Sequence, residues 1–222
     1  PWGEGVAVDL TSARAMTFHD STGLAIHTPV ALEPAPPLCP TPDWQGRIID
    51  AFGHPLDGRP LPQGHTKTDL RAAPPPATGR RPLGPRLGTG VAALDTMLPL
   101  VRGQRIGVFA GSGVGKSSLL AELAKNTPAD RVVLGLIGER GRELRHFTDE
   151  VLGEAGLARS VVIAATSDQS PLIKRRAGWA AMAVAEAFRN QGDNVLLLVD
   201  SLTRMAEAHR EVALTAGEPA SL

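Results

Sequence analysis

The stretch "IGVFAGSGVGKSSLLAELAKN", from Ile106 to Asn126, contains an apolar run, a glycine-rich turn and a helical pattern in direct succession. The run "IGVFA" (106–110) predicts a buried strand, and "KSSLLAELAKN" predicts a helix that begins at Lys116. Glycines let the backbone between them turn tightly with its N–H groups pointing inward, and the helix N-terminus adds the positive end of its dipole. A strand, such a turn and a helix in this order are typical of a phosphate-binding loop.

The pattern G-x-x-x-x-G-K-[ST] gives individual roles to the loop residues. Lys116 can reach the β- and γ-phosphates of a nucleotide, and the Ser117 hydroxyl can ligate Mg²⁺. Ala110 takes the place of the first glycine, where a small residue serves because the strand ends there. A glycine-rich turn with an accidental Lys-Ser pair is the alternative, and the flanking strand and helix argue against it. The predicted nucleotide-binding loop consists of Ala110, Gly111, Ser112, Gly113, Val114, Gly115, Lys116, Ser117 and Ser118.

Three further apolar runs follow the loop, and helical patterns separate them. The runs are "VVLGLI" (132–137), "VVIAA" (161–165) and "VLLLV" (195–199). Strands that are apolar throughout and alternate with helices indicate a mostly parallel sheet with helices on both faces. This pattern predicts an α/β fold of the P-loop NTPase class. The helical patterns are "ELRHFTDEVLGEAG" (143–156), "IKRRAGWAAMAVAEAFRNQG" (173–192) and "TRMAEAHREVAL" (203–214).

Asp200 directly follows the last of these runs. Open α/β sheets bind ligands at the carboxyl ends of their strands, so Asp200 and the loop are expected at one edge. A carboxylate there can hold a water of the Mg²⁺ shell opposite Ser117. Asp200 could instead cap the following helix, but the loop upstream favours the metal role.

The sequence "GERGRE" (138–143) follows the run 132–137 and should reach the same edge. Glu139 is the candidate that polarises the attacking water, Arg140 can meet the γ-phosphate, and Glu143 can support the Mg²⁺ shell. A solvated helix start is the alternative, because acidic residues are favoured in a first helical turn. That alternative is sufficient for the two further basic residues, Arg142 and Arg145.

The chain upstream of Thr89 has a different composition. Between Gly5 and Glu33, the short runs "VAVDL", "AMTF", "LAI" and "VAL" predict three or four small strands. Proline and glycine dominate from Pro34 to Gly88, where only "WQGRIIDAFGHPLDGRP" (44–60) has enough apolar residues for a strand and a turn. The predicted organisation is a domain remainder at 1–33, a connecting arm at 34–88 and a nucleotide-binding core at 89–222.

The overall composition narrows the class of partner. The formal net charge is zero, aromatic residues are 4% and there is no Tyr, all of which argue against a nucleic-acid partner. The single cysteine, Cys39, cannot form an internal disulfide, which fits a reducing cytoplasm, and its proline-rich surroundings argue against a catalytic thiolate. No apolar run approaches the roughly 20 residues that cross a bilayer. The chain opens without Met and ends after a helical pattern, so we expect it to be incomplete at both ends.

Taken together, these motifs resemble the rotary-type ATPases, and most of all the flagellar and type III protein-export ATPases. The resemblance implies a RecA/F1-like core preceded by the remainder of an N-terminal β-barrel. It also implies Mg²⁺-dependent hydrolysis of ATP to ADP and phosphate by a homo-oligomeric, hexameric ring. The supporting text is "GRIIDAFGHPLDG", "GVAALDTMLPLVRGQRIGVFAGSGVGKSSLL", "IGERGRELRHF" and "ATSDQSPLIKRRAGWAAMAVAEAFRNQGDNVLLLVDSLTRMAEAHREVAL".

The resemblance also implies residue roles. Glu139 falls on the catalytic carboxylate, which non-hydrolysing subunits replace with Gln, and this favours a catalytic subunit. The family's arginine finger, its aromatic adenine contact and its C-terminal helical domain fall beyond Leu222. Met205 stands where many relatives have an aromatic residue. The family's phosphate and magnesium positions fall on Arg140, Glu143, Asp200 and Arg204.

The function implied is ATP hydrolysis that energises export of flagellar proteins across the bacterial inner membrane. Such a protein is cytoplasmic, lies peripherally at the inner face of the membrane, and has export-apparatus, regulator and chaperone–cargo partners. A catalytic-type subunit of a rotary ATP synthase and a virulence type III secretion ATPase remain alternatives. A ring-type RNA translocase would need exposed aromatics, and the segment before the arm offers only Phe18. Glu139 argues against a non-hydrolysing regulator.

Overall fold

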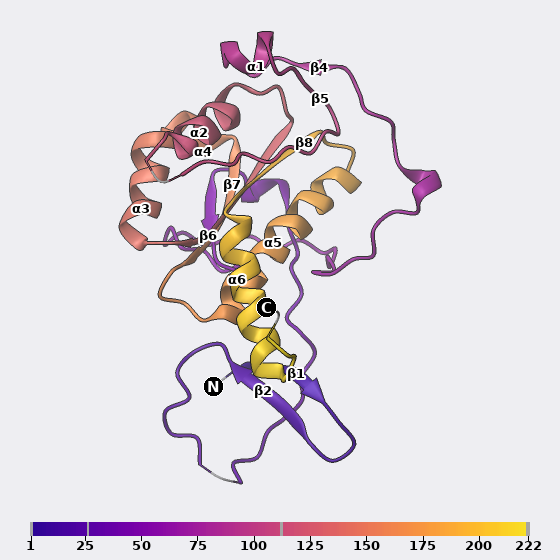
Figure 1. The fold of residues 1–222 in the computed structure, drawn as a ribbon, viewed down its shortest axis with the longest axis vertical. Coiled ribbons are helices and arrows are strands. Elements are labelled where there is room, and N and C mark those ends of the chain that lie inside the picture. Colours follow the sequence, from indigo (N-terminus) through magenta and orange to yellow (C-terminus); the bar gives the residue numbers. More distant parts are fainter. Residues whose placement is uncertain (1, 26, 112, 221–222) are drawn as a thin grey trace.

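The structure, a computed structural model, describes residues 2–25, 27–111 and 113–220. Its centre is a four-stranded sheet with the order β3–β7–β6–β8. All three pairings in this sheet are parallel, which confirms the predicted parallel sheet (Figure 1). The runs predicted at 132–137, 161–165 and 195–199 are all strands of it. The strands are β3 (Arg47–Ile49), β6 (Arg131–Glu139), β7 (Ser160–Thr166) and β8 (Val195–Asp200).

Helices cover both faces of the sheet, as the uniformly apolar strands predict. Along β6, Val133 and Ile137 belong to the hydrophobic cluster beneath α5 (Pro171–Asn190) and α6 (Leu202–Ala216). Leu134 and Leu136 belong to the opposite cluster, beneath α2 (Lys116–Asn126). The period-2 alternation of a strand sends neighbouring side chains to opposite faces, so β6 is buried on both. Figure 1 shows these helices on the two sides of the sheet.

The helix predicted at 143–156 is interrupted. It is divided into α3 (Gly141–His146), the π-helical segment η3 (Phe147–Leu152) and α4 (Gly153–Ala158). Gly153 has a φ of 66°, in the left-handed region that a regular α-helix excludes, and this explains the break. The other three predicted helices are α2, α5 and α6. The remaining short elements are α1 (Ala92–Thr96), η1 (Pro42–Trp44) and η2 (Ala77–Gly79).

The prediction of a strand at 106–110 is wrong. This segment forms no strand, and its apolar side chains are exposed: Ile106 by 47%, Val108 by 37% and Phe109 by 97%. A strand needs a neighbour to pair with. Within the described residues β8 pairs with β6 alone, and no strand pairs with 106–110. The nearest upstream pairing is a short antiparallel ladder of β4 (Arg86–Leu87) with β5 (Leu100–Val101).

The N-terminal segment forms one antiparallel hairpin of β1 (Gly3–Val8) and β2 (Ala13–Thr17). The run "VAL" (30–32) forms no strand, and "LAI" (24–26) extends to residue 26, which lies outside the described residues. The predicted number of three or four strands is therefore too high for the part of the segment that is described. Val6 and Met16 pack against the cluster beneath α5 and α6, so the hairpin lies against the core (Figure 1).

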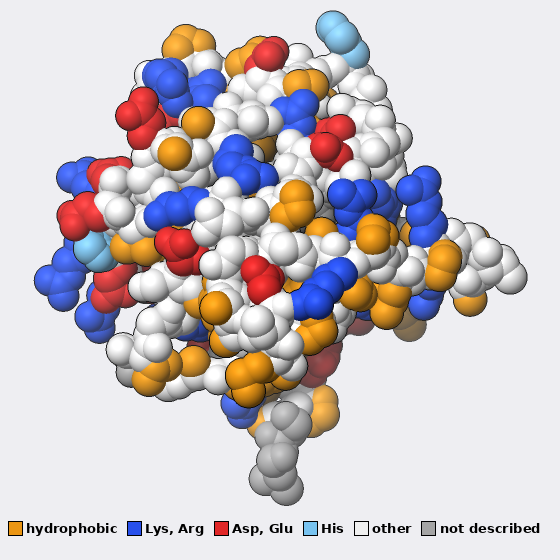
Figure 2. All heavy atoms as spheres, turned by 90° about the horizontal axis from the view of Figure 1, so that it is seen from above, with side chains coloured by type: hydrophobic (Ala, Val, Ile, Leu, Met, Phe, Trp, Pro, Cys, Tyr) orange, Lys and Arg blue, Asp and Glu red, His pale blue; other side chains and the backbone are white. Residues whose placement is uncertain are grey.

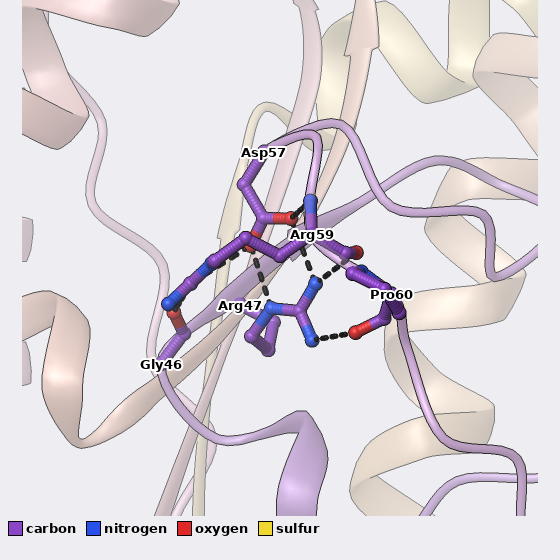
Figure 3. Close-up of polar contacts among 5 residues, drawn as sticks. All are labelled: Gly46, Arg47, Asp57, Arg59 and Pro60. Atoms are coloured by element: carbon purple, nitrogen blue, oxygen red, sulfur yellow. Dashed lines mark hydrogen bonds and ion pairs between the residues drawn. The ribbon is translucent and has the colours of Figure 1, made fainter.

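The proline-rich arm contributes part of the core. Strand β3 pairs with β7. Ile49 of β3 is buried, and so are Leu38 and Trp44, which precede this strand. The predicted strand and turn at 44–60 are thus present. Arg47 anchors the turn by donating to Asp57 (2.6 and 2.8 Å) and to the carbonyl oxygens of Arg59 and Pro60 (2.6 and 2.9 Å; Figure 3).

The surface mixes charges of both signs. Figure 2 shows Lys, Arg, Asp and Glu side chains interspersed on the face seen from above, as expected from 23 basic and 23 acidic residues. Among the described residues, no helix has the length and apolar character required to cross a bilayer.

Candidate nucleotide-binding site

The glycines of the predicted loop adopt the backbone conformations that require glycine. Gly113 and Gly115 have φ values of 77° and 93°, in the left-handed region where a Cβ is unfavourable. Gly115 is the N-cap of α2, so the turn leads directly into the helix. Residues 113–115 are exposed, which leaves their backbone N–H groups open to a ligand. Ala110 and Gly111 precede the turn in the exposed segment, and Ser112 lies outside the described residues.

Helix α2 positions Lys116 over the carboxyl edge of the sheet. The buried side chains of Leu120 and Leu123 fix this helix on the cluster that contains Leu134 and Leu136 of β6. Lys116 therefore lies in the first turn above the end of β8, where its Nζ forms an ion pair with Asp200 Oδ1. The contact joins residues that are 84 positions apart in the sequence.

Asp200 is not the cap of the following helix. Ser201 is the N-cap of α6, and its hydroxyl oxygen accepts from the backbone N–H of Arg204 at 3.3 Å. The Asp200 side chain is 6% exposed and is directed to Lys116 instead. The capping alternative for Asp200 is therefore excluded, and its carboxylate faces the loop.

The oxygen groups at this edge fit a magnesium ion. Ser117 is exposed in the first turn of α2, next to the lysine that contacts Asp200. A hydroxyl and one carboxylate suit Mg²⁺, which keeps several waters and takes its other ligands from the phosphates of its substrate. The described residues contain no cluster of three or more His, Cys, Asp or Glu side chains for a metal.

Glu139 lies at the same edge, at the end of β6. In the parallel register Leu136 is opposite Asp200, so Glu139 extends three residues beyond it. The Glu139 carboxylate forms an ion pair with Nη1 of Arg204 on α6. The same Nη1 donates to the carbonyl oxygen of Gly138 at 2.9 Å.

The pKa of Arg204 is raised, and the hydrogen bond to Glu139 is the main cause. Partial burial opposes this shift, and the negative charges of Glu139, Asp200 and Glu143 reinforce it. Arg204 is thus a fixed cation among the carboxylates that the sequence assigns to catalysis and to magnesium.

Arg140 and Glu143 lie at the periphery, where α3 begins. Their side chains are 68% and 47% exposed, and Arg140 Nη1 is 3.8 Å from Glu143 Oε1. This geometry is a weak surface pair, and a bound nucleotide would have to draw both side chains inward. Arg142 and Arg145 are exposed on the same short helix, as the solvated alternative predicts.

Gly138 is a site residue that sequence reasoning missed. Its φ is 75°, and a Cβ added to it would lie 2.8 Å from Cδ of Arg204. Glycine is therefore required for Arg204 to lie across the end of β6. The only available signal was the glycine that opens "GERGRE". A cavity of about 230 Å³ adjoins this point, and Gly138, Ser167, Lys174, Arg204, Glu207 and Glu211 line it.

A glycine turn leading into a helix, with its lysine over the Asp at the end of a parallel strand, defines a P-loop nucleotide-binding domain. Comparison with known families agrees: residues 90–222 match the nucleotide-binding domain of the ATP synthase alpha/beta family. The chain belongs to this family.

Individual relatives point in the same direction. The chain is 49% identical to the flagellum-specific ATP synthase of Caulobacter vibrioides, over 94% of this chain and 48% of the relative. It is 52% identical to the SPI-2 type 3 secretion system ATPase of Salmonella typhimurium, over 79% of this chain and 40% of the relative. It thus spans about half the length of the curated relatives it matches, or less.

The fold agrees with a solved structure of an assembled enzyme. The assembled ATPase EscN from the type III secretion system of enteropathogenic E. coli superposes with a TM-score of 0.90 and is 37% identical. The superposition covers 98% of this chain and 53% of EscN. The RecA/F1-like fold class predicted from the sequence is therefore confirmed.

Proposed function

We propose that this chain is the nucleotide-binding part of a Mg²⁺-dependent ATPase that energises export of flagellar proteins. The observation that carries the proposal is the contact of Lys116 with Asp200, at the sheet edge where Glu139 also lies. This supports a site in which Lys116 binds phosphate, Asp200 serves the metal ion and Glu139 supplies a second carboxylate.

Each group has a distinct task in hydrolysis of ATP to ADP and phosphate. Lys116 leaves Asp200 and neutralises the β- and γ-phosphates. The residues Ser117, Asp200 and Glu143 would hold Mg²⁺ at this edge. When bound, Mg²⁺ stabilises the charge on the phosphate oxygens. Glu139 orients the attacking water and accepts its proton, while Arg140 and Arg204 approach the γ-phosphate.

The working assembly we propose is a homo-oligomeric, hexameric ring. The chain resembles EscN, which is known as an assembled ATPase and in complex with its central stalk EscO. By analogy, the ring is cytoplasmic and peripheral at the inner face of the membrane, with export-apparatus, regulator and chaperone–cargo partners and no nucleic acid. The hairpin region 1–33 would belong to an N-terminal β-barrel, and 34–88 would connect it to the core at 89–222.

A virulence type III secretion ATPase is the second candidate. Identity to the Salmonella SPI-2 enzyme is 52%, as high as to the flagellar relatives, so identity does not separate the two branches. Deletion of the gene and assay of both flagellation and effector secretion separates them. Loss of filaments alone supports the flagellar proposal, and loss of effector secretion alone contradicts it.

Substitution of Lys116 tests the nucleotide site. In the full-length protein, Lys116→Ala removes a charged hydrogen bond to phosphate, and we expect ATP affinity to fall about 10- to 100-fold in calorimetry. Lys125→Ala, on the same helix and paired with Glu122, should retain the affinity. Unchanged ATP binding by Lys116→Ala would overturn the assignment of the loop.

Substitution of Glu139 tests the chemical step. Glu139→Gln keeps the shape of the side chain but cannot accept a proton, so kcat should fall about 10²- to 10⁴-fold while ATP binding persists. The exposed Glu154→Gln is the matched control. Phosphate release by Glu139→Gln at the normal rate would show that another group is the base.

A further inference from the structure

The contacts of Glu139 indicate that Arg204 has a second task at this site. Its side chain is 20% exposed and is held from one side by Arg204. Arg204 spans both the carbonyl oxygen of Gly138 and the carboxylate of Glu139 with one terminal nitrogen. A guanidinium that contacts both a backbone carbonyl oxygen and the neighbouring carboxylate fixes that carboxylate relative to the strand.

The same guanidinium retains free donors. Within the described part of the chain, all contacts of its N–H groups are made by Nη1, and Nε and Nη2 have no partner. An arginine carries five N–H donors in a rigid fork. Arg204 can therefore hold Glu139 and still offer its remaining donors to a phosphate.

The fold is adapted to this contact at two points. Gly138 leaves room for Arg204, because any Cβ there would lie 2.8 Å from its Cδ. The Ser201 cap fixes the start of α6 through the backbone N–H of Arg204 itself. The position of the guanidinium is thus set by its own backbone and by the strand it contacts.

We propose that Arg204 is a positioning residue for Glu139: it orients that carboxylate in the free site and links it to the γ-phosphate when ATP binds. This inference rests on the proposed function, because it requires Glu139 to be the base. It changes the role of Arg204 from one phosphate ligand among several to the link between the nucleotide and the base.

A test of this proposal must separate it from a simple phosphate contact. Arg204→Gln in the full-length protein should lower kcat about 10- to 100-fold, as loss of an orienting partner does, and should weaken ATP binding by a smaller factor, because only the donors to the γ-phosphate are lost from binding. The double variant Arg204→Gln/Glu139→Gln should have a kcat within about threefold of that of Glu139→Gln, because a residue that acts through Glu139 loses its effect once that carboxylate is gone.

Other charged groups near Arg204 stay in place in these variants, so they do not cause the loss of kcat. They are Glu143 from α3, Asp200 from β8, Lys174 from α5, and Glu207 and Glu211 from α6. Arg204→Lys keeps the charge without the fork, and should restore only part of the kcat. Arg210→Gln removes an exposed arginine from the same helix and should change neither kcat nor ATP binding.

The outcomes distinguish the two hypotheses. If Arg204→Gln weakens ATP binding by the same factor as kcat/KM, and lowers kcat equally in the parent protein and in Glu139→Gln, Arg204 is only a phosphate ligand and the inference is overturned. If Glu139→Gln turns over normally, the proposed function itself fails, whatever Arg204 does. Unfolding midpoints and ring assembly equal to those of the parent protein establish that each variant is folded.

Discussion

At the scale of single residues, Arg47 shows how a charged group becomes part of the core. Its side chain is 8% exposed, and burial of an arginine costs free energy unless its donors are satisfied. Asp57 supplies both carboxylate oxygens, and two carbonyl oxygens of the following residues complete the set (Figure 3). The guanidinium therefore fixes the turn between β3 and the rest of the arm.

Asp57→Asn should destabilise the fold by about 3 kcal/mol, because it leaves a buried guanidinium without its counter-ion. Urea denaturation at pH 7 measures this difference. Asp43→Asn removes the same charge from an exposed position in the same segment, and should leave the midpoint almost unchanged. Equal midpoints for Asp57→Asn and the parent protein would contradict the role of this ion pair.

The same ion pair predicts a pH dependence of stability. The Arg47 guanidinium holds the pKa of Asp57 well below its ordinary value of 3.8. A carboxyl whose pKa is lower in the folded than in the unfolded state stabilises the fold fully above its unfolded pKa, and this contribution is lost as pH falls towards the folded pKa. The gap in stability between the parent protein and Asp57→Asn should be constant from pH 6 to 8 and should shrink below about pH 4. A gap that is the same at pH 3 and pH 7 would refute this explanation.

At the scale of elements, most of the sheet could be predicted from the sequence because its strands carry their own signal. The strand β6 has seven consecutive buried residues, and only a strand covered on both faces requires such a run. The loop glycines and Lys116 could equally be predicted from the sequence, because their chemistry depends on local spacing. The role of Glu139 followed from its place after the run 132–137, whereas the role of Arg204 entered through family resemblance, and the contact between the two could not be predicted from spacing.

The failures have a common cause. The run 106–110 is as apolar as the true strands, but a strand also depends on a partner that the sequence does not specify. Gly153 interrupts a helical pattern without changing its apolar spacing. Arg204 lies 65 residues from Glu139 in the sequence, so only the parallel register and the cap of α6 bring them together.

The packing of α5 on α6 depends on a small residue facing a large one. Gly178 is buried in α5, and a Cβ added there would lie 2.3 Å from the sulfur of Met205 on α6. Met205 thus fills the space over Gly178, which gives a structural reason for the flexible side chain at this position.

Gly178→Ala should destabilise the fold by about 1 kcal/mol, because crowding of Met205 outweighs the better helix propensity of alanine. Met205→Ala alone should cost about 2 kcal/mol through the cavity it leaves. The double variant should cost less than the sum by at least about 0.5 kcal/mol, since each change relieves the defect of the other. Chemical denaturation of the four proteins measures this coupling, and strictly additive costs would exclude the contact.

At the scale of the whole molecule, two contacts attach the N-terminal hairpin to the far end of the core. Arg175 of α5 pairs with Glu4 of β1 at 3.0 Å, and Arg14 of β2 donates to the carbonyl oxygen of Ala216 at 2.9 Å. The second contact caps the C-terminal end of α6, where a cation is favoured by the helix dipole. Figure 1 shows the hairpin beneath this end of α6, the helix whose other end carries Arg204.

The pair of Glu4 with Arg175 should determine how firmly the hairpin is attached. The Arg175 side chain is 10% exposed and its guanidinium carbon lies 4.6 Å from the ring centroid of Trp179. Its Nε is buried and has no hydrogen-bond partner among the described residues. Glu4→Gln removes the counter-charge of the pair and leaves a buried cation, so the hairpin should open more easily, by about 1–3 kcal/mol.

Hydrogen exchange measures this opening: it should accelerate in residues 3–17 and stay unchanged in β6 and β7. The exposed Glu33→Gln serves as the control. Equal exchange rates of residues 3–17 in Glu4→Gln and in the parent protein would mean that apolar packing of Val6 and Met16 alone holds the hairpin on α6.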